Sequence, residues 1–453
     1  MSGSVEDFSS GLSEDVRHSV RAAATKFTRA RLVGLQDNVP QLEIARTQAA
    51  AIKDFVLANL KDLLLQFEAM AQENGVQVHW ANDAKSASDQ ILQICASKAD
   101  AGSTIVKAKS MATEEIHLNE VLLGQGFDVV ETDLGEFVVQ LDEDTPSHIV
   151  APIIHKSARD VSRTFEAHGL GPRSEDPVVL TKQARTFLRE KFKTASIGIS
   201  GVNFGIAETG RIVLVENEGN NRFCTTAPKI HIALMGIEKL LPSERHLPLF
   251  LKLLCGSATG QQLATTIHLI SGPKRQQELD GPEEVHVILL DNGRSGVLAS
   301  EYREILRCIR CGACLNVCPV YRQASGHGYG SVYSGPVGAV LTPLLSGLAP
   351  FGHLAKASTL CGACEEVCPV KIPIPDMLLN LRHDSAEASL PMDPGSWKAF
   401  SFSARNPVAW RAGLEMLPLL EDIPLGPANS WAKSRELPHR EGRSFRRWWR
   451  DRS

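Results

Sequence analysis

The chain has 453 residues, of which 43% are hydrophobic and 22% are charged, and its formal net charge is −4. This composition is ordinary for a globular protein with a sizeable core, and the length predicts about two to four domains. The small negative charge gives no electrostatic reason to expect nucleic-acid binding. The first residues lack the basic and apolar regions of a signal peptide, and no uncharged apolar run is long enough to span a membrane. We therefore expect a cytoplasmic protein without a transmembrane segment.

Residues 1–70 are predicted to form a helical N-terminal arm. A basic, amphipathic stretch covers residues 16–31, and apolar residues recur at helical spacing between residues 41 and 70. We expect this arm to pack on the next domain or on a partner.

Short β-rich runs alternate with helical stretches between residues 71 and 295. The predicted strands are 76–80, 104–108, 127–131, 137–141, 197–200, 211–216, 265–270 and 285–290. The predicted helices are 84–96, 113–124, 153–168 and 180–194. Strands separated by helices of about ten or more residues indicate an α/β domain with a largely parallel sheet.

Two stretches of this region, 198–210 and 216–222, are rich in glycine and asparagine. Such residues at strand ends allow positive φ and close backbone approach, so they are typical either of a ligand cleft or of tight turns. Neither stretch contains the dinucleotide motif G-x-G-x-x-G after a strand, and the chain has no G-x-x-x-x-G-K-[ST] motif. The polar candidates for such a cleft are Lys109, Ser110, His117 and Glu208.

Seven of the ten cysteines lie in two runs. The first run, from Cys308 to Pro319, has the C-x2-C-x2-C-x3-C-P spacing of bacterial two-cluster ferredoxins, and the second, from Cys361 to Pro369, repeats its last part. Closely spaced cysteines on a tight turn direct three thiolates at one iron–sulfur cluster, whereas the fourth, followed by proline, serves the other cluster. The pattern predicts an electron-carrying iron–sulfur module rather than a disulfide framework.

Crossed fourth ligands assign the cysteines to two sets. The first cluster takes Cys308, Cys311, Cys314 and Cys368, and the second takes Cys318, Cys361 and Cys364. We predict two 4Fe–4S clusters. A zinc interpretation is disfavoured, because zinc sites usually lack the x3-C-P extension.

The second set lacks a fourth thiolate, because Ser358 stands at the position that matches Cys308. Three outcomes remain open for this set. It could hold a 3Fe–4S cluster, or a 4Fe–4S cluster with serine, water or a carboxylate on one iron. Alternatively, Cys224 or Cys255 could reach in from the α/β domain.

The 42 residues between Cys318 and Cys361 exceed the interval found in compact ferredoxins. This length favours a helical two-cluster ferredoxin-type domain over residues 296–390. His327 and Tyr329 lie in the interval, where either could tune a cluster by hydrogen bonding, although packing or turn roles are the simpler interpretation.

The remaining extension, residues 391–453, contains tryptophan and proline and ends in the basic, aromatic segment Ser444-Phe-Arg-Arg-Trp-Trp449. Tryptophan and arginine are frequent anchors of protein interfaces. We expect this extension to dock on a partner or on the chain itself.

Several segments together resemble the lactate utilization protein B family. They are residues 201–210, 215–220, 231–239 and 283–286, both cysteine runs and the Ser-Phe-Arg-Arg-Trp-Trp tail. The departures are Asn221 and Cys224, where glycine and an apolar residue would be expected. The resemblance also implies that a second run with three cysteines is typical of the family.

This family is the iron–sulfur component of a bacterial three-protein system that oxidises L-lactate to pyruvate. The resemblance implies an α/β domain of the CoA-transferase and sugar-isomerase type, followed by a dicluster domain. It also implies lactate utilization proteins A and C as partners, together with an electron acceptor that the sequence does not identify.

Two hypotheses for function follow. In the first, the chain is an electron-transfer subunit of an L-lactate dehydrogenase complex, since it carries no flavin or nicotinamide motif for two-electron chemistry. In the second, it is a catalytic subunit of a 2-hydroxy-acid dehydrogenase, with the substrate bound in the α/β domain near Asn203, Glu208 and Glu218. A DNA-binding iron–sulfur switch is unsupported, because no helix-turn-helix or basic patch is present.

Overall fold

The structure is a computed structural model that describes residues 12–388, 394–416 and 445–452. The chain divides into two compact units, Met1–Ala388 and Ser389–Ser453. Within the described residues, no helix combines the length and apolar character that crossing a membrane requires.

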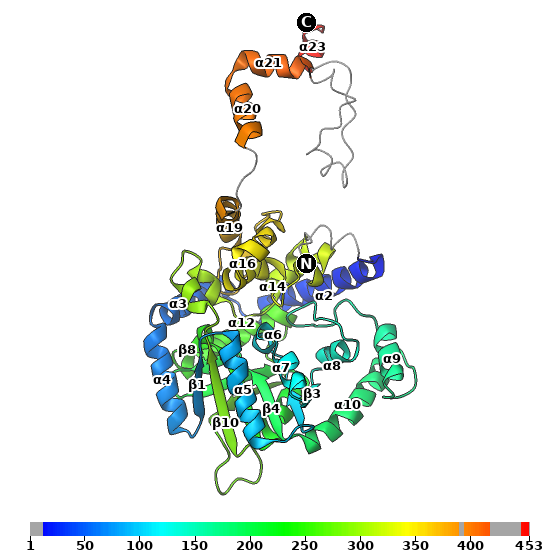
Figure 1. Cartoon of the computed structure of the whole chain (residues 1–453), viewed down its shortest axis with the longest axis vertical. Helices are drawn as coiled ribbons and strands as arrows, with labels where there is room; N and C mark the ends of the chain where they lie inside the picture. The colour runs from blue at the N-terminus through cyan, green and yellow to red at the C-terminus, as the bar shows by residue number, and fades with distance from the viewer. Residues whose placement is uncertain (1–11, 389–393, 417–444, 453) are drawn as a thin grey trace. The chain divides into compact units, whose positions relative to one another are not determined.

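A six-stranded parallel sheet forms the centre of the first unit (Figure 1). Every pairing between neighbouring strands is parallel, which confirms the predicted α/β fold. In spatial order the strands are β1 (Gln77–Ala81), β10 (Glu284–Leu290), β7 (Ile230–Gly236), β4 (Ile197–Gly201), β2 (Thr104–Lys107) and β3 (Asp128–Glu131).

Alternate residues of the central strands pack into two different cores, because successive side chains of a strand point to opposite faces. Ile232 and Leu234 of β7 pack on one face with Ile91 of α5. Ala233 and Met235 of the same strand pack on the other face with the α4 side chains, including Phe67. Both faces of the sheet are therefore covered, as is usual for parallel sheets.

The helices of the α/β region flank this sheet. They are α4 (Leu60–Glu73), α5 (Ala84–Lys98), α6 (Met111–Glu115), α7 (Leu118–Gly124), α8 (Leu134–Leu141), α9 (Ala158–Ala167), α10 (Pro177–Thr194), α11 (Asn220–Thr226) and α12 (Leu247–Thr259). A second, mixed sheet has the order β8 (Leu240–Leu241), β5 (Phe204–Ile206), β6 (Arg211–Glu216) and β9 (Thr266–Ile270). The short 3-10 helices η1 (Ile237–Lys239) and η2 (Glu244–His246) connect these elements.

One predicted strand is wrong. Residues 137–141 belong to helix α8, whose first turn is capped by the Asp133 side chain, which accepts from Gly135 N at 2.9 Å and Glu136 N at 3.2 Å. The apolar residues of this helix recur at helical spacing, so the β-rich composition was misleading. They are Leu134, Phe137, Val138 and Leu141.

Other predicted elements need smaller corrections. The helix predicted at 113–124 is two helices, α6 and α7, because His117 takes a left-handed conformation with φ of 51° between them. The short helix α13 (Arg294–Leu298) and the 3-10 helix η3 (Arg303–Arg307) lead into the first cysteine run. Strand β7 and helix α12 were not predicted, because both are apolar on nearly all sides and lack the alternation that marks amphipathic elements.

The N-terminal helices α2 (Glu14–Asn38) and α3 (Leu42–Ala58) lie between the α/β region and the cysteine-containing region (Figure 1). Helix α2 packs on α12 and on the short helices that follow the first cysteines. Arg307 forms an ion pair with Asp54 of α3, with N–O distances of 2.6 and 2.8 Å. From residue 12 onward, where the structure describes it, the predicted arm is thus helical and is packed against both regions.

The cysteine-containing region consists of short helices, as predicted. They are α14 (Ala313–Val317), α15 (Tyr321–Ala324), η4 (His327–Tyr329), α16 (Gly335–Ser346), α17 (Leu348–Phe351), η5 (Gly352–Lys356), α18 (Ala363–Glu366) and α19 (Ile374–Ala388). Its buried side chains continue into the core of α2, α3 and α12.

The second unit contains the helices α20 (Pro394–Arg405), α21 (Pro407–Met416) and α23 (Phe445–Arg450). Trp448 and Trp449 of α23 are exposed, and the Arg452 guanidinium lies 4.4 Å from the centroid of the Trp448 ring. The remaining residues of the predicted extension lie outside the described ranges.

Candidate iron–sulfur site and adjoining cavity

The two cysteine runs form matching loops. Arg310 and Leu360, each directly before a cysteine, have φ of 61° and 53°, and the glycines after those cysteines, Gly312 and Gly362, have φ of 74° and 82°. A short helix, α14 or α18, follows each loop. Left-handed conformations at non-glycine residues are uncommon and cluster at functional sites. The sequence repeat is thus also a structural repeat.

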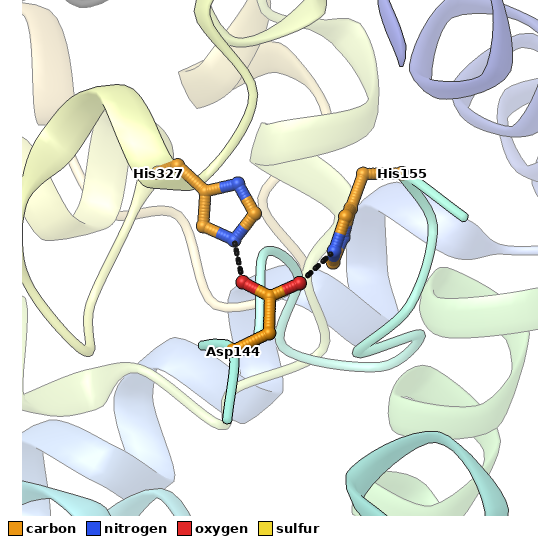
Figure 2. A group of neighbouring side chains, drawn as sticks. All are labelled: Asp144, His155 and His327. Carbon is orange, nitrogen blue, oxygen red and sulfur yellow. Dashed lines mark hydrogen bonds and ion pairs between the residues drawn. The ribbon is translucent and has the colours of Figure 1, made fainter. Parts of the chain in front are cut away.

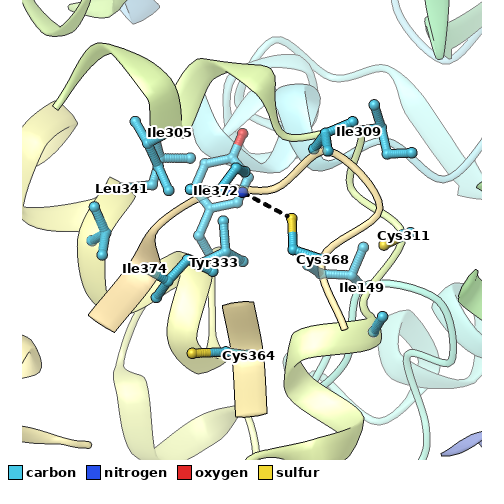
Figure 3. Close-up of a cluster of buried hydrophobic side chains, with 14 of the residues drawn as sticks. Ile149, Ile305, Ile309, Cys311, Tyr333, Leu341, Cys364, Cys368, Ile372 and Ile374 are labelled. Carbon is cyan, nitrogen blue, oxygen red and sulfur yellow. Dashed lines mark hydrogen bonds between the residues drawn. The ribbon is translucent and has the colours of Figure 1, made fainter. Parts of the chain in front are cut away.

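The first four assigned cysteines surround one small, largely apolar cavity. Cys308, Cys311 and Cys314 of the first run line it together with Cys368 of the second run. Apolar side chains complete the wall, among them Ile149, Ile309, Val337, Ile372 and Ile374. Figure 3 shows Cys311 and Cys368 with Ile149, Ile309, Ile372 and Ile374 of this wall. The donor set, four thiols around an apolar space, is the one that a 4Fe–4S cluster uses.

Backbone N–H groups point at several of the sulfurs. Cys308 Sγ accepts from Arg310 N at 3.4 Å, Cys368 Sγ from Ile372 N at 3.4 Å, and Cys318 Sγ from Tyr321 N at 3.5 Å. Hydrogen bonds of this kind stabilise the charge of a ligated thiolate and help to set cluster potentials.

The second set of cysteines, Cys318, Cys361 and Cys364, lies nearer the surface. Burial, together with the neighbouring Cys318 and Cys361, raises the pKa of Cys364 to about 12. Cys361 is exposed, and hydrogen bonds from the Thr359 side chain and the Ala363 N–H lower its pKa. The three thiols therefore form a second group, one member of which is open to solvent.

The structure gives no support to Cys224 or Cys255 as a fourth ligand of this set. Cys224 is buried against Val106 and Ala108 in the α/β region, 3.2 Å from Thr132 Oγ1. Cys255 lies on α12. Ser358 is close in sequence, but its hydroxyl accepts from Leu360 N at 3.1 Å.

The two tuning candidates differ in position. Tyr329 is buried beside Cys318, the only partner within the described residues to which its hydroxyl is placed to donate. Burial, and then the negative charge of Cys318, holds the pKa of Tyr329 well above its usual value. His327 instead points toward Asp144 and His155 (Figure 2), with its Nε2 at 2.7 Å from the Thr145 carbonyl oxygen. Only Tyr329 is placed to interact with a cluster through Cys318.

Several cations surround the first cysteine group. Arg46 donates to the Cys368 carbonyl at 2.8 Å, and Arg31 donates to the Val367 carbonyl at 2.9 Å. Arg310 adjoins Cys308 in the loop, and Lys239 lies close enough for the Cys308 charge to act on its pKa. Sequence reasoning missed these residues. Comparing the two runs position by position would have found Arg310, since its counterpart is the uncharged Leu360.

A larger cavity, of about 280 Å³, lies at the carboxyl ends of the parallel strands. Ligands of open α/β sheets generally bind at this edge. Its lining includes Lys109, Ser110, Asp133, Ile149, Asn203, Glu216, Glu218, Asn221, Lys239, Arg294, Arg310 and Tyr333. Of the two interpretations that the sequence left open here, a cleft is present, and its lining contains the candidates Lys109, Ser110, Asn203 and Glu218.

Two predicted cleft residues do not line this cavity. His117 is exposed, 3.3 Å from Glu120. Glu208 is also on the surface, where it accepts from Ser243 Oγ at 2.5 Å and Glu244 N at 3.3 Å. The structure therefore does not bring Glu208 together with Asn203 and Glu218, beside which the second hypothesis placed it.

A buried ion network borders the cavity. Arg294 binds Glu238 through Nε at 2.7 Å and Glu115 through Nη1 at 2.8 Å and Nη2 at 2.7 Å. Gly236 is required beside it, since a Cβ there would lie 2.3 Å from the Glu238 carboxylate. Burial raises the pKa of Glu238, but the charges of Arg294 and Arg310 outweigh it and lower the pKa to about 2.

An α/β domain joined to a paired-cysteine region of this geometry defines an iron–sulfur dicluster protein. The family models agree: residues 64–290 match the LUD domain, residues 304–372 match the 4Fe-4S dicluster domain, and residues 378–453 match the lactate utilisation protein B C-terminal domain.

The chain belongs to the lactate utilization protein B family. It is 41% identical over 460 residues to lactate utilization protein B of Bacillus subtilis (strain 168), covering 99% of this chain and 96% of the relative. It is also 42% identical over 429 residues to the uncharacterized electron transport protein YkgF of Escherichia coli (strain K12), covering 91% of this chain and 89% of the relative.

A solved structure of a DUF162 family protein from Deinococcus radiodurans covers 51% of this chain and 98% of its own chain, with 16% identity and a TM-score of 0.30. That score is too low to establish a shared fold.

Proposed function

We propose that this chain passes single electrons through two 4Fe–4S clusters during the oxidation of L-lactate to pyruvate. The membership of the family and the dicluster region support electron transfer in lactate utilization. The observation that carries the proposal is the small cavity that Cys368 of the second run shares with three cysteines of the first. Independent metal sites would keep each run's cysteines together, whereas a two-cluster module exchanges the fourth ligand.

In this proposal each part of the chain has a role. The N-terminal helices (1–70) and the α/β domain (71–295) support the two-cluster domain (296–390), and the extension (391–453) docks on a partner. The proposed partners are lactate utilization proteins A and C and an unidentified electron acceptor, in the cytoplasm.

The proposed ligands are the two sets of cysteines expected from the sequence. The first cluster would be held by Cys308, Cys311, Cys314 and Cys368, and the second by Cys318, Cys361 and Cys364. An iron–sulfur cluster supplies one-electron redox chemistry when bound. The chain's own residues hold the sulfurs, donate backbone hydrogen bonds to them and exclude water from the first site.

A second candidate function is favoured by the large cavity, which is built like a ligand site. In that case the chain would be a catalytic subunit of a 2-hydroxy-acid dehydrogenase. The two candidates make different predictions for the anaerobically purified chain alone. If the chain is an electron relay, dithionite reduces its clusters but L-lactate does not unless the partners are present. If it is a catalytic subunit, L-lactate alone reduces the clusters and lowers their visible absorbance.

A further inference from the structure

Two histidines and an aspartate converge at a place that neither proposed function uses (Figure 2). Asp144 and His155 belong to the strap, residues 142–157, which joins helices α8 and α9. His327 is the first residue of η4, in the interval between the two cysteine runs. One ligand atom of each residue lies within 4.8 Å of the ligand atoms of the other two. The three residues form what we call the His–Asp group.

The distances within the His–Asp group are those of a metal coordination shell. His155 Nε2 lies 2.9 Å from Asp144 Oδ2, and His327 Nε2 lies 3.7 Å from Asp144 Oδ1. Ligand atoms bound at about 2.0–2.1 Å to a tetrahedral zinc ion are about 3.3 Å apart, and the two observed distances lie on either side of this value. The Thr145 carbonyl oxygen, 2.7 Å from His327 Nε2, borders the same space. Two imidazoles and one carboxylate are a ligand set of transition-metal sites that keep an open position for water.

Ser147 orients the His155 ring for such a role. Its Oγ lies 2.7 Å from His155 Nδ1 and 3.2 Å from the Pro152 carbonyl oxygen. Because the single hydroxyl hydrogen is donated to the Pro152 carbonyl, Oγ accepts from His155 Nδ1–H. The lone pair of the neutral ring is then on Nε2 and faces the Asp144 carboxylate, so a cation between them is favourable. Metal-ligating histidines generally donate their other ring N–H in this way.

The charges around the His–Asp group also favour a cation. Lys156 Nζ lies 2.8 Å from both Asp142 Oδ2 and Asp144 Oδ2, so one positive charge faces two carboxylates. With neutral histidines the surroundings therefore keep a net negative charge, which attracts a cation. The side chains of His155 and His327 are 7% and 14% exposed, whereas that of Asp144 is 30% exposed. The space is thus enclosed on the histidine side, and an ion can enter past Asp144.

We propose that the His–Asp group binds one divalent transition-metal ion, through Nε2 of His155, Nε2 of His327 and a carboxylate oxygen of Asp144. The site is a third metal centre, separate from the two cysteine groups. The inference goes beyond the proposed function and does not rest on it, because all three ligands lie outside the cysteine sets.

A metal ion at this place ties the strap to the cysteine-containing region. The strap already contacts that region, since the Tyr321 hydroxyl donates to the Ser147 carbonyl at 2.5 Å and His148 Nε2 lies 3.1 Å from Asn316 Oδ1. Ile149 of the strap lines the cavity of the first cysteine group. Because the three ligands meet only in the folded chain, the metal binds the folded state and raises its stability.

Zinc uptake by the anaerobically purified full chain tests the site. The chain is incubated with Zn²⁺, desalted and analysed for zinc and iron by mass spectrometry, and competition with a chelator gives the affinity. About one zinc per chain is expected, with unchanged iron content and a higher melting temperature. His155→Gln and Asp144→Asn should each lower the zinc affinity by about 100-fold or more, since losing a ligand costs more than losing an outer partner. His117→Gln, whose side chain is 70% exposed, is the matched control and should leave the affinity unchanged.

The inference is overturned if a chain with intact iron–sulfur signals takes up no zinc, which would leave the His–Asp group as a set of hydrogen bonds only. It is also overturned if His155→Gln, folded with unchanged cluster signals, binds zinc like the parent chain. Ser147→Ala keeps all three ligands and should still bind zinc, about tenfold more weakly. Zinc uptake that requires His155 in a chain without iron–sulfur signals would support the site and refute the electron relay, whereas intact clusters without zinc uptake would do the opposite.

Discussion

The two cysteine groups share a loop geometry but differ in their surroundings. The first is enclosed by apolar side chains and bordered by the cations Arg31, Arg46, Lys239 and Arg310. The second has an exposed cysteine, Cys361, and a buried tyrosine hydroxyl beside Cys318. Since reduction adds negative charge, nearby cations favour it, by about 2 kcal/mol for each charge at about 8 Å. A repeated motif can thus hold two centres of different potential, with the first expected to be higher.

The largest expected effect is the loss of one centre at a time. Cys311→Ser should remove the first cluster signal and Cys364→Ser the second, because each takes one thiolate from a different set. EPR of the reduced, anaerobically purified variants measures this. Cys95→Ser, in the buried core of α5, is the matched control and should retain both signals. The ligand assignment would be wrong if either cluster variant kept both signals.

The buried ion network of Arg294, Glu238 and Glu115 should make a large contribution to the free energy of unfolding. Arg294 and Glu238 have side chains that are 2% and 1% exposed, so Arg294→Gln leaves buried carboxylates without their partner. We expect the free energy of unfolding to fall by about 3–5 kcal/mol. Arg159→Gln, which breaks an exposed ion pair with Glu175, should change it by less than about 1 kcal/mol. Chemical denaturation compares the two, and equal effects would contradict the network's role.

The same network predicts the response to acid. The pKa of Glu238 is about 2 in the folded chain, below its ordinary value of 4.5. A lowered carboxyl pKa stabilises the fold above the ordinary value, and this stability is lost as the pH falls toward 2. Unfolding should therefore become easier between about pH 4.5 and 2, and Glu238→Gln should flatten this part of the profile. A variant that lost stability as steeply as the parent chain would count against the assignment.

A moderate effect is expected for the potential of the first cluster. Arg46→Gln removes a cation that donates to the Cys368 carbonyl. The midpoint reduction potential of the first cluster should therefore fall by tens of millivolts, while that of the second cluster stays constant. Arg163→Gln, on α9 where its side chain is 59% exposed, serves as the control. Redox titration followed by EPR measures both midpoints. A shift confined to the second cluster would reverse the assignment.

The smallest effect should come from the tyrosine beside the second group. Tyr329→Phe removes a hydroxyl that lies near Cys318 without another partner among the described residues. Losing a potential hydrogen-bond donor to a sulfur should lower the second midpoint slightly. The same titration detects it, with Tyr302→Phe, whose hydroxyl binds Asp384 away from the cysteines, as the comparison. An equal change at both midpoints would indicate a general packing effect.

Local patterns predicted the α/β fold and the cysteine loops because each has a short-range signal. Ligand spacing fixes the loop around Cys311, and alternation marks strands such as β6. The large cavity could only partly be predicted, because Lys109, Asn203 and Lys239 follow different strands and meet only when the parallel sheet assembles. Helix α8 was missed because β-branched residues outweighed its helical spacing, and Glu208 was misplaced because a glycine-rich turn does not reveal which way it faces.

The iron and acid-labile sulfide content of the anaerobically purified full chain tests the central claim most directly. Two clusters on the seven cysteines predict about eight of each per chain, or about seven iron atoms if the second is a 3Fe–4S cluster. A colourless chain that contains zinc and no labile sulfide would contradict the account.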